Sequence, residues 1–211
     1  MPKVERDVCF VTKEGMVQMV RPRELDTEQA VHGAMLLFWE RGYRGTTVGD
    51  VQQTLGIGRA SLYAAFGDKE GLFLRALGRY RERYSAPSTA ALDADGPALD
   101  AVRAFFRGLV LRYTDSATPR GCLVTTTVME CAGLGGAIER ALARSIATGE
   151  AALRRALRRA RATGELPEGT DTRALARFLV AAGQGMALMA RVTGSRTVVE
   201  DVARVALSVL R

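Results

Sequence analysis

Apolar side chains recur along this chain with the period of an α-helix, and the alternation typical of β-strands is nearly absent. Glycines and prolines divide the periodic stretches from one another. We predict helices over about 28–41, 47–55, 58–65, 69–84, 98–115, 122–131, 137–163, 171–191 and 197–210. The expected N-terminal caps are Thr27, Thr47, Asp68, Asp171 and Thr197. The pattern therefore indicates an all-α protein of about nine helices.

The predicted helices fall into two groups. Short helices fill residues 21–68, and the helix 69–84 links them to a larger C-terminal unit, 85–211. Residues 85–97 (SAPSTAALDADGP) have the composition of a loop. The first twenty residues show no period, and they form either a disordered arm or a segment upstream of the true start. We favour translation from Met16 or Met19, because Lys-Glu-Gly at 13–15 can be encoded by a run resembling a ribosome-binding site.

Composition narrows the class of protein. Hydrophobic residues make up 47% of the chain, which is enough for a folded core and excludes a disordered chain. The net charge of +7 makes an anionic partner plausible. Three scattered cysteines favour a reduced cytoplasm over a disulfide framework. The longest apolar run, 178–190, is shorter than the ~18 residues of a membrane span, so we expect no membrane association.

One stretch, GIGRASLYAAFGDKEGLF (56–73), has the length of a helix-turn-helix. The second helix of that motif directs its N-terminal residues at base edges in the major groove. Arg59 is placed to donate two hydrogen bonds to a guanine, and Tyr63 and Lys69 to contact phosphates. Thr46 and Thr47 begin the preceding helix beside Arg44. The predicted contacts with double-stranded DNA are Arg44, Thr46, Thr47, Gly58, Arg59, Ala60, Ser61, Tyr63 and Lys69.

Residues 27–84 resemble the N-terminal domain of the TetR family of bacterial transcriptional repressors. The matching segments are FWERGYRGTTVGDV, LGIGRASLYAAFGDKEGLF and the apolar helix that follows. The resemblance implies a homodimer that binds a palindromic operator and a C-terminal domain that binds a small-molecule effector. Ala64 and Ala65 depart from the family pattern, in which polar or aromatic residues often follow the tyrosine, which puts one or two phosphate contacts in doubt.

The C-terminal unit offers candidates for both implied roles. The last helix carries one apolar stripe, and with the apolar helix before it this would form a four-helix dimer interface. The predicted interface residues are Val198, Val202, Val205 and Val209. An effector pocket between the central helices needs aromatic, adaptable and a few polar groups. The predicted pocket residues are Phe106, Leu109, Tyr113, Thr126, Met129, Met186 and Met189.

Other functions have weaker support. Cys122 or Cys131 would be the thiol of a redox or metal sensor, although positions nine apart on a helix point to nearly opposite sides. Arginines within 154–162 suggest a solvated helix face, or else a contact with nucleic acid or with an acidic partner. With one histidine and no nucleophile motif we expect no enzyme, no catalytic residues, no metal and no cofactor. A helical interaction protein that does not bind DNA stays as the remaining alternative.

Overall fold

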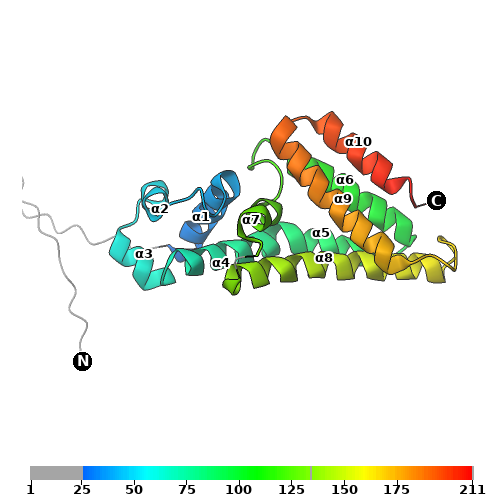
Figure 1. Ribbon diagram of the computed structural model, residues 1–211, viewed down its shortest axis with the longest axis horizontal. Coiled ribbons are helices and arrows are strands. Elements are labelled where there is room, and N and C mark those ends of the chain that lie inside the picture. The colour runs from blue at the N-terminus through cyan, green and yellow to red at the C-terminus, as the bar shows by residue number, and fades with distance from the viewer. Residues whose placement is uncertain (1–25, 134, 211) are drawn as a thin grey trace, which may run out of the picture.

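The protein is built from helices, which Figure 1 shows as a small cluster at one end of a longer helical body. The computed structural model describes residues 26–133 and 135–210, so the predictions for residues 1–20 lie outside the described residues. Within those ranges no residue is in a β-strand, as the all-α prediction requires. The α-helices are α1 Thr27–Arg41, α2 Val48–Leu55, α3 Arg59–Phe66, α4 Lys69–Tyr80, α5 Ala86–Ala90, α6 Ala98–Thr114, α7 Leu123–Cys131, α8 Gly136–Ala162, α9 Thr172–Thr193 and α10 Arg196–Leu207.

Helices α1 to α4 form the N-terminal unit (residues 26–80) around an aromatic core. Phe38 of α1 meets Phe73 of α4 edge to face, with ring centroids 5.1 Å apart. Leu62 and Phe66 of α3 are buried on the inner side of their helix, as their spacing predicted. Edge-to-face contacts of this kind fix helix positions beyond simple area burial. The core thus sets the orientation of α3 relative to α4.

Most predicted caps are correct, and two are displaced by one or two residues. Thr47 and Asp50 form a reciprocal capping box at α2. Asp68 and Asp171 cap α4 and α9. Asp26, and not Thr27, caps α1, because its Oδ1 accepts hydrogen bonds from two main-chain N–H groups of the first turn. Ser195, and not Thr197, caps α10 for the same reason.

The predicted loop at 85–97 is wrong for most of its length. A π-turn (Arg81–Ser85) continues α4 directly into α5, and a 3₁₀ turn (Ala91–Asp93) follows. The hydroxyls of Ser88 and Thr89 donate to main-chain carbonyls one turn back, at 2.8 Å and 3.1 Å, within the segment that contains Pro87. The segment from α4 through the π-turn to α5 is one continuous helical rod. If it is counted once, the described residues contain nine α-helical rods, which is the predicted number.

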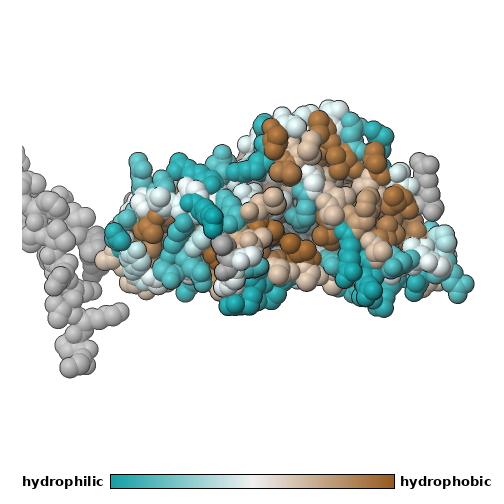
Figure 2. Space-filling model, in the orientation of Figure 1, coloured by the Kyte–Doolittle hydropathy of each residue, from teal (hydrophilic) through white to brown (hydrophobic). Residues whose placement is uncertain are grey.

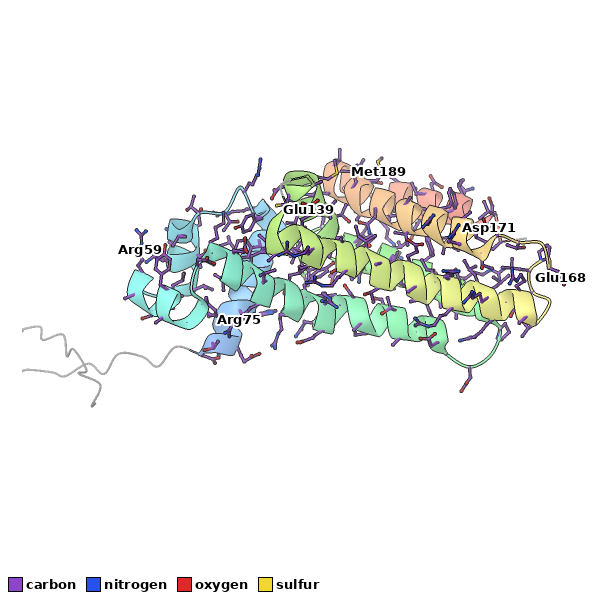
Figure 3. The ribbon with its side chains drawn as sticks, turned by 60° about the horizontal axis from the view of Figure 1, so that its bottom comes forward. Arg59, Arg75, Glu139, Glu168, Asp171 and Met189 are labelled. Carbon is purple, nitrogen blue, oxygen red and sulfur yellow. The ribbon has the colours of Figure 1, made fainter. Side chains whose placement is uncertain are left out.

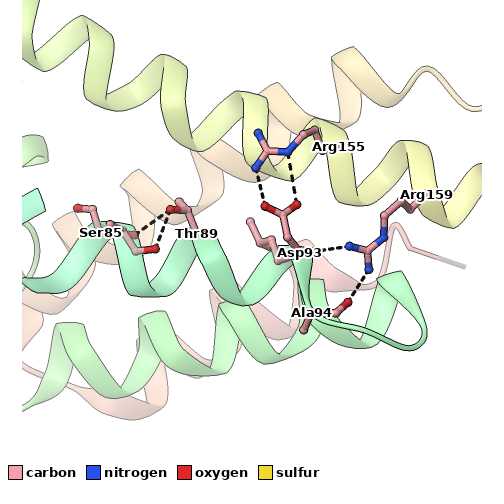
Figure 4. A network of polar contacts seen from close by, with 8 residues as sticks. Ser85, Thr89, Asp93, Ala94, Arg155 and Arg159 are labelled. Carbon is pink, nitrogen blue, oxygen red and sulfur yellow. Dashed lines mark hydrogen bonds and ion pairs between the residues drawn. The ribbon is translucent and has the colours of Figure 1, made fainter. Parts of the chain in front are cut away.

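Arginines of α8 hold the end of this rod in place. Arg155 forms an ion pair with Asp93 at 2.7 Å, and Arg159 donates to the carbonyls of Leu92 and Ala94 (Figure 4). The arginine-rich stretch was predicted to be a solvated helix face, but two of its arginines bind the end of the α4–α5 rod and so stabilise the fold. These long-range contacts explain why a segment with loop composition is helical.

Helices α6, α8, α9 and α10 pack together as the body of the molecule. Helix α9 packs against α6, α8 and α10. By length and hydropathy α9 meets the criteria for a membrane span, which the sequence argument did not expect, and 33% of its most apolar window is buried in the protein. Much of its apolar surface is therefore left uncovered by the single chain.

Candidate nucleic-acid interface and internal cavity

The outer side of α3 is the candidate nucleic-acid interface. Gly58 caps this helix without a side chain, and Arg59, Ala60 and Ser61, which follow it, are exposed. Arg59 points away from the body at the free end of the N-terminal unit (Figure 3). The main-chain N–H groups at such a helix start carry partial positive charge and favour anions. The first turn of α3 is therefore open to a phosphate or to base edges.

Arg59 and Tyr63 lie on the same side of α3. The Arg59 Nη2 is 3.5 Å from the Tyr63 hydroxyl, and its guanidinium carbon lies 5.5 Å from the ring centroid. Tyr63 is 37% exposed, so its hydroxyl is accessible. The contact holds the guanidinium near the surface of the helix, which lowers the entropy lost when it binds a planar partner. The two residues form one unit of the candidate interface.

Thr46 and Thr47 are adjacent in sequence, but they differ in exposure to solvent. Thr46 is fully buried, and its hydroxyl donates to the carbonyl of Gly42 at 2.7 Å. Its predicted phosphate contact is wrong, because Thr46 has no exposed surface to offer a phosphate on the outside of the protein. Thr47 is exposed at the start of α2, where its hydroxyl also exchanges hydrogen bonds with Asp50. Arg44 is exposed beside it.

Lys69 is the first residue of α4, and its ammonium group has a defined position. Its Nζ lies 4.3 Å from the centroid of the Tyr43 ring, a cation–π distance. Burial lowers the pKa of Lys69, while Glu130 opposes this shift. Lys69 supplies a fixed positive charge next to α3.

The charge of the N-terminal unit is balanced. Residues 26–80 contain six Lys and Arg and six Asp and Glu, so the net charge of +7 arises elsewhere in the chain. Arg41 and Arg79 are paired with Asp50 and Glu28. The basic residues of this unit with no ion pair in the described ranges are Arg44, Arg59, Lys69 and Arg75. Attraction to a polyanion thus depends on a few directed side chains.

A cavity of about 370 Å³ lies inside the body, between the α4–α5 rod, α6, α8 and α9. Its size is in the usual range for small-molecule sites. Leu109 and Tyr113 of the predicted pocket set line it, and so does Cys122. Phe106 and Met186 are fully buried in the core without reaching the cavity. Thr126, Met129 and Met189 lie outside it as well, and Met129 is 76% exposed.

One prominent residue of the cavity wall, Arg112, was not predicted from the sequence. Arg112 follows Phe105 and Leu109 at the spacing i, i+4, i+7, so all three share one side of α6. This spacing was visible in the sequence. A charged residue on the inward-facing apolar stripe of a helix is uncommon, and this feature of the sequence could have identified Arg112 as a residue of the cavity.

The hydroxyl groups of two buried tyrosines, Tyr80 and Tyr113, lie around Cys122 at the cavity. The Tyr80 hydroxyl donates to the Cys122 Sγ at 3.3 Å. Burial raises the pKa of Tyr113 to about 12, and that of Tyr80 is also well above its usual value, so both phenols are protonated and able to donate at neutral pH. Donors and apolar walls therefore meet in the same cavity.

The two buried cysteines of the body have separate surroundings. Cys131 lies near Glu130, Arg44 and Lys69. Burial and the Glu130 carboxylate raise the pKa of Cys131, which disfavours the thiolate that a reactive cysteine needs. Among the residues described, no three His, Cys, Asp or Glu side chains gather as a metal site would require. The thiol-sensor alternative gains no geometric support at Cys131.

Of the four valines predicted for a dimer interface, Val198, Val202 and Val205 lie on α10, and Val209 lies in the turn just after it. Val205 and Val209 are exposed, at 59% and 47%, whereas Val198 and Val202 are partly buried. Helix α9 continues the apolar surface with Phe178, Leu188 and Val192. Figure 2 shows hydrophobic colour gathered over α9 and α10, while the N-terminal unit is mostly hydrophilic. Contiguous apolar surface of this kind marks an interaction site.

Comparison with known proteins agrees with this arrangement. Residues 30–76 match the family described as bacterial regulatory proteins, tetR family, and residues 98–206 match the tetracyclin repressor-like C-terminal domain. The HTH-type transcriptional repressor ComR of Escherichia coli is 33% identical over 172 residues, which is 81% of this chain and 82% of ComR. The uncharacterized HTH-type regulator YezE of Bacillus subtilis is 35% identical over 91% of this chain and all of YezE.

A solved structure shares both the fold and part of the sequence. It is a cysteine-substituted variant of the TetR family regulator CifR in complex with 26-base-pair operator DNA. Its TM-score is 0.79 at 33% identity, and the match covers 90% of this chain and 98% of that one.

Proposed function

This chain belongs to the TetR family of bacterial regulatory proteins, and we propose that it is a homodimeric repressor that a small molecule releases from a palindromic operator. As a TetR-type regulator it binds DNA and is not an enzyme. A DNA-binding regulator of this kind works in the cytoplasm. The observation that carries the proposal is the exposed first turn of α3, with Arg59 and Tyr63 on its outer side.

Each protomer would place α3 in one major groove. Arg59 would contact a guanine edge, while Ser61 and the main chain at Gly58 and Ala60 approach the bases closely. Tyr63, Lys69, Thr47 and Arg44 would contact phosphates and fix the register. Thr46 is excluded from this set because it is buried. The CifR variant, which shares this fold, was solved in complex with operator DNA, and this supports DNA binding as the function.

Dimerisation would place two N-terminal units on one side of the assembly. The exposed apolar residues of α9 and α10 would pack against their symmetry mates, which completes the burial of α9. The functional division that we propose runs between an operator-binding unit, 21–68, and an effector and dimerisation unit, 85–211. Helix 69–84 joins them, and no loop interrupts the chain at residue 85.

The effector would bind in the cavity of about 370 Å³. The wall of this cavity includes Gly78, Arg81 and Ser85, which belong to the same helical rod as Lys69. A ligand that prefers a different position of this rod would change the spacing of the two α3 helices. A coupling free energy of ~1–3 kcal/mol between the two sites accounts for ordinary effector responses.

The test is a mobility-shift assay with DNA flanking the gene of this protein, at two salt concentrations and with nonspecific competitor. A discrete complex that resists competitor supports the proposal, and its affinity should fall as salt rises. If that DNA gives no complex, selection of bound fragments from the whole genome follows. Recovery of no enriched palindrome from that selection would contradict the proposal.

A further inference from the structure

The cavity holds a cationic side chain that lacks an anionic partner. Arg112 is partly buried on the cavity wall, where its Nε is fully enclosed, and its guanidinium carbon lies 4.9 Å from the centroid of the Tyr113 ring. An arginine side chain does not lose its proton in a protein. A full positive charge therefore lies inside the body of the molecule.

The hydrogen bonds of Arg112 leave part of the guanidinium unused. Its Nη1 donates to the carbonyl of Tyr84 at 2.8 Å and to the Ser88 hydroxyl at 3.3 Å. Its Nε is buried without any acceptor. Over the described residues no carboxylate lies within ion-pair distance of Arg112, although seven other arginines have one. A buried charge left unpaired is costly, which is why such groups are normally matched by an opposite charge.

The remainder of the wall suits an apolar molecule. Phe105, Leu109, Ile146 and Leu179 line the space. Two further charges, on Arg81 and Glu82, are exposed at the same cavity and are opposite in sign, so together they add little net charge. Arg112 is thus the charge that decides which ligands are favoured in the interior.

We propose that the effector is an organic acid whose carboxylate pairs with Arg112 and whose apolar body fills the cavity between α6, α8 and α9. This inference rests on the proposed function of the cavity as the effector site. A carboxylate would accept side-on from Nε and a neighbouring Nη, a charge-assisted arrangement that Arg favours. The Tyr113 hydroxyl accepts from the same guanidinium and also contacts the Cys122 thiol.

Arg112 also connects this ligand to the helical rod of the N-terminal unit. The Tyr84 carbonyl that accepts from Arg112 belongs to the π-turn between α4 and α5. The Tyr84 ring packs on Trp39 of α1, with centroids 5.2 Å apart. A carboxylate that draws the guanidinium toward the cavity would weaken its bond to the π-turn and change the surroundings of Trp39. Since π-turns are frequent at functional sites, this is a suitable hinge.

The experiment compares acids with neutral amides of the same shape. Octanoate is paired with octanamide and phenylacetate with phenylacetamide, and binding is followed by fluorescence of Trp39, the single tryptophan of the chain. Isothermal calorimetry supplies an independent readout. We expect at least one acid to bind at least about tenfold more tightly than its amide, and sulfate, which lacks an apolar body, to bind more weakly than that acid.

Variants separate a role of Arg112 from general charge effects. Arg112→Gln should abolish the preference for the acid, and Arg107→Gln, an exposed arginine of the same helix, should leave it unchanged. Arg112→Lys retains the positive charge but loses the paired N–H donors of the guanidinium, so it should keep a reduced preference for the acid over the amide. This variant tests the inference if Arg112→Gln fails to fold.

Equal affinity for acid and amide, a preference unchanged in Arg112→Gln, or no binding of either member of both pairs would overturn the inference. Operator binding by the unliganded protein is measured in the same preparations. A protein that binds its operator but shows no acid preference refutes only the ligand class. A protein that binds no operator refutes the proposed function.

Discussion

Arg191, near the end of α9, caps the C-terminus of α1 through the carbonyl of Trp39. Its Nη1 donates to that oxygen at 3.0 Å, and its Nη2 donates to the carbonyl of Glu40. The last carbonyls of a helix have no partner within the helix, so a guanidinium from another element satisfies two of them. The effector and dimerisation helix α9 is thereby fixed to the first helix of the N-terminal unit.

We predict that Arg191→Gln loosens this attachment. The loss of a charged donor from two carbonyls should lower the free energy of unfolding by about 1–3 kcal/mol, since the site is only partly buried. Chemical denaturation measures the change, and hydrogen exchange should show faster exchange at the end of α1. Arg173→Gln on the exposed first turn of α9 is the control. Equal losses in the two variants would show that Arg191 has no special role.

Arg59→Ala should reduce specificity together with affinity. Loss of a bidentate contact with guanine costs about 1–3 kcal/mol of discrimination, and one operator position should tolerate substitution in the variant. Fluorescence anisotropy with an operator and a set of single-base variants measures both effects. Arg158→Ala, an exposed arginine of α8, matches the change in charge. If every base position were still discriminated as in the parent protein, Arg59 would not contact a base.

Lys69→Met should weaken binding to all DNA sequences by a similar factor. The ammonium group, positioned over the Tyr43 ring, would neutralise a phosphate, and phosphates carry no sequence information. The slope of log affinity against log salt should therefore decrease by about one per protomer. Anisotropy titrations over a range of salt concentrations test this. An unchanged slope, with affinity lost for the operator alone, would reassign Lys69 to positioning α3.

Val205→Glu should dissociate the proposed dimer. In the proposed dimer the substitution would place a carboxylate from each protomer in an apolar interface, where like charges close together cost several kcal/mol. We expect the dissociation constant to rise at least about a hundredfold, and operator affinity to fall with it. Sedimentation velocity measures the oligomeric state. Leu111→Glu alters an exposed leucine of α6, outside α9 and α10, and should remain dimeric. A dimeric Val205→Glu protein would exclude this stripe from the interface.

Glu165 should make the stability of the body dependent on acidic pH. Its carboxylate accepts hydrogen bonds from the main-chain N–H groups of Ala98 and Leu99, both at 2.9 Å, and so caps α6. The hydrogen bond from Leu99, followed by those from Ala98 and Thr163, lowers the pKa of Glu165 in the folded protein. Its contribution is therefore complete above the pKa of the unfolded chain and is lost as the pH falls through the folded pKa.

The corresponding variant is Glu165→Gln. At neutral pH it should be less stable by about 1 kcal/mol, the usual effect of losing a cap, and the difference from the parent should shrink in acid. Denaturation curves at several pH values measure this difference. Glu168, in the loop at the far end of the body (Figure 3), provides the control Glu168→Gln. A difference that stays constant down to the lowest pH would contradict the capping role.

The sequence by itself determined which residues form the N-terminal helices and which side of α3 is exposed. Local rules are sufficient there, because Thr47 and Asp50 cap each other and Gly56 ends α2 in the left-handed conformation. The spacing of Leu62 and Phe66 also fixes the inner face of α3. The same local periodicity placed Val198, Val202 and Val205 on one helix, α10.

Only the tertiary structure decided where distant segments meet. The helix through residues 85–93 depends on Arg155 and Arg159, more than sixty residues away, and a loop-like composition does not encode that support. Thr46 is buried by its bond to Gly42, which is invisible in a pattern of polar residues. The cavity is likewise lined by residues from five separate segments. The sequence therefore could not show that Arg112 lies at this cavity without a counter-ion. Periodicity is a property of one helix, whereas burial and charge pairing are properties of their assembly.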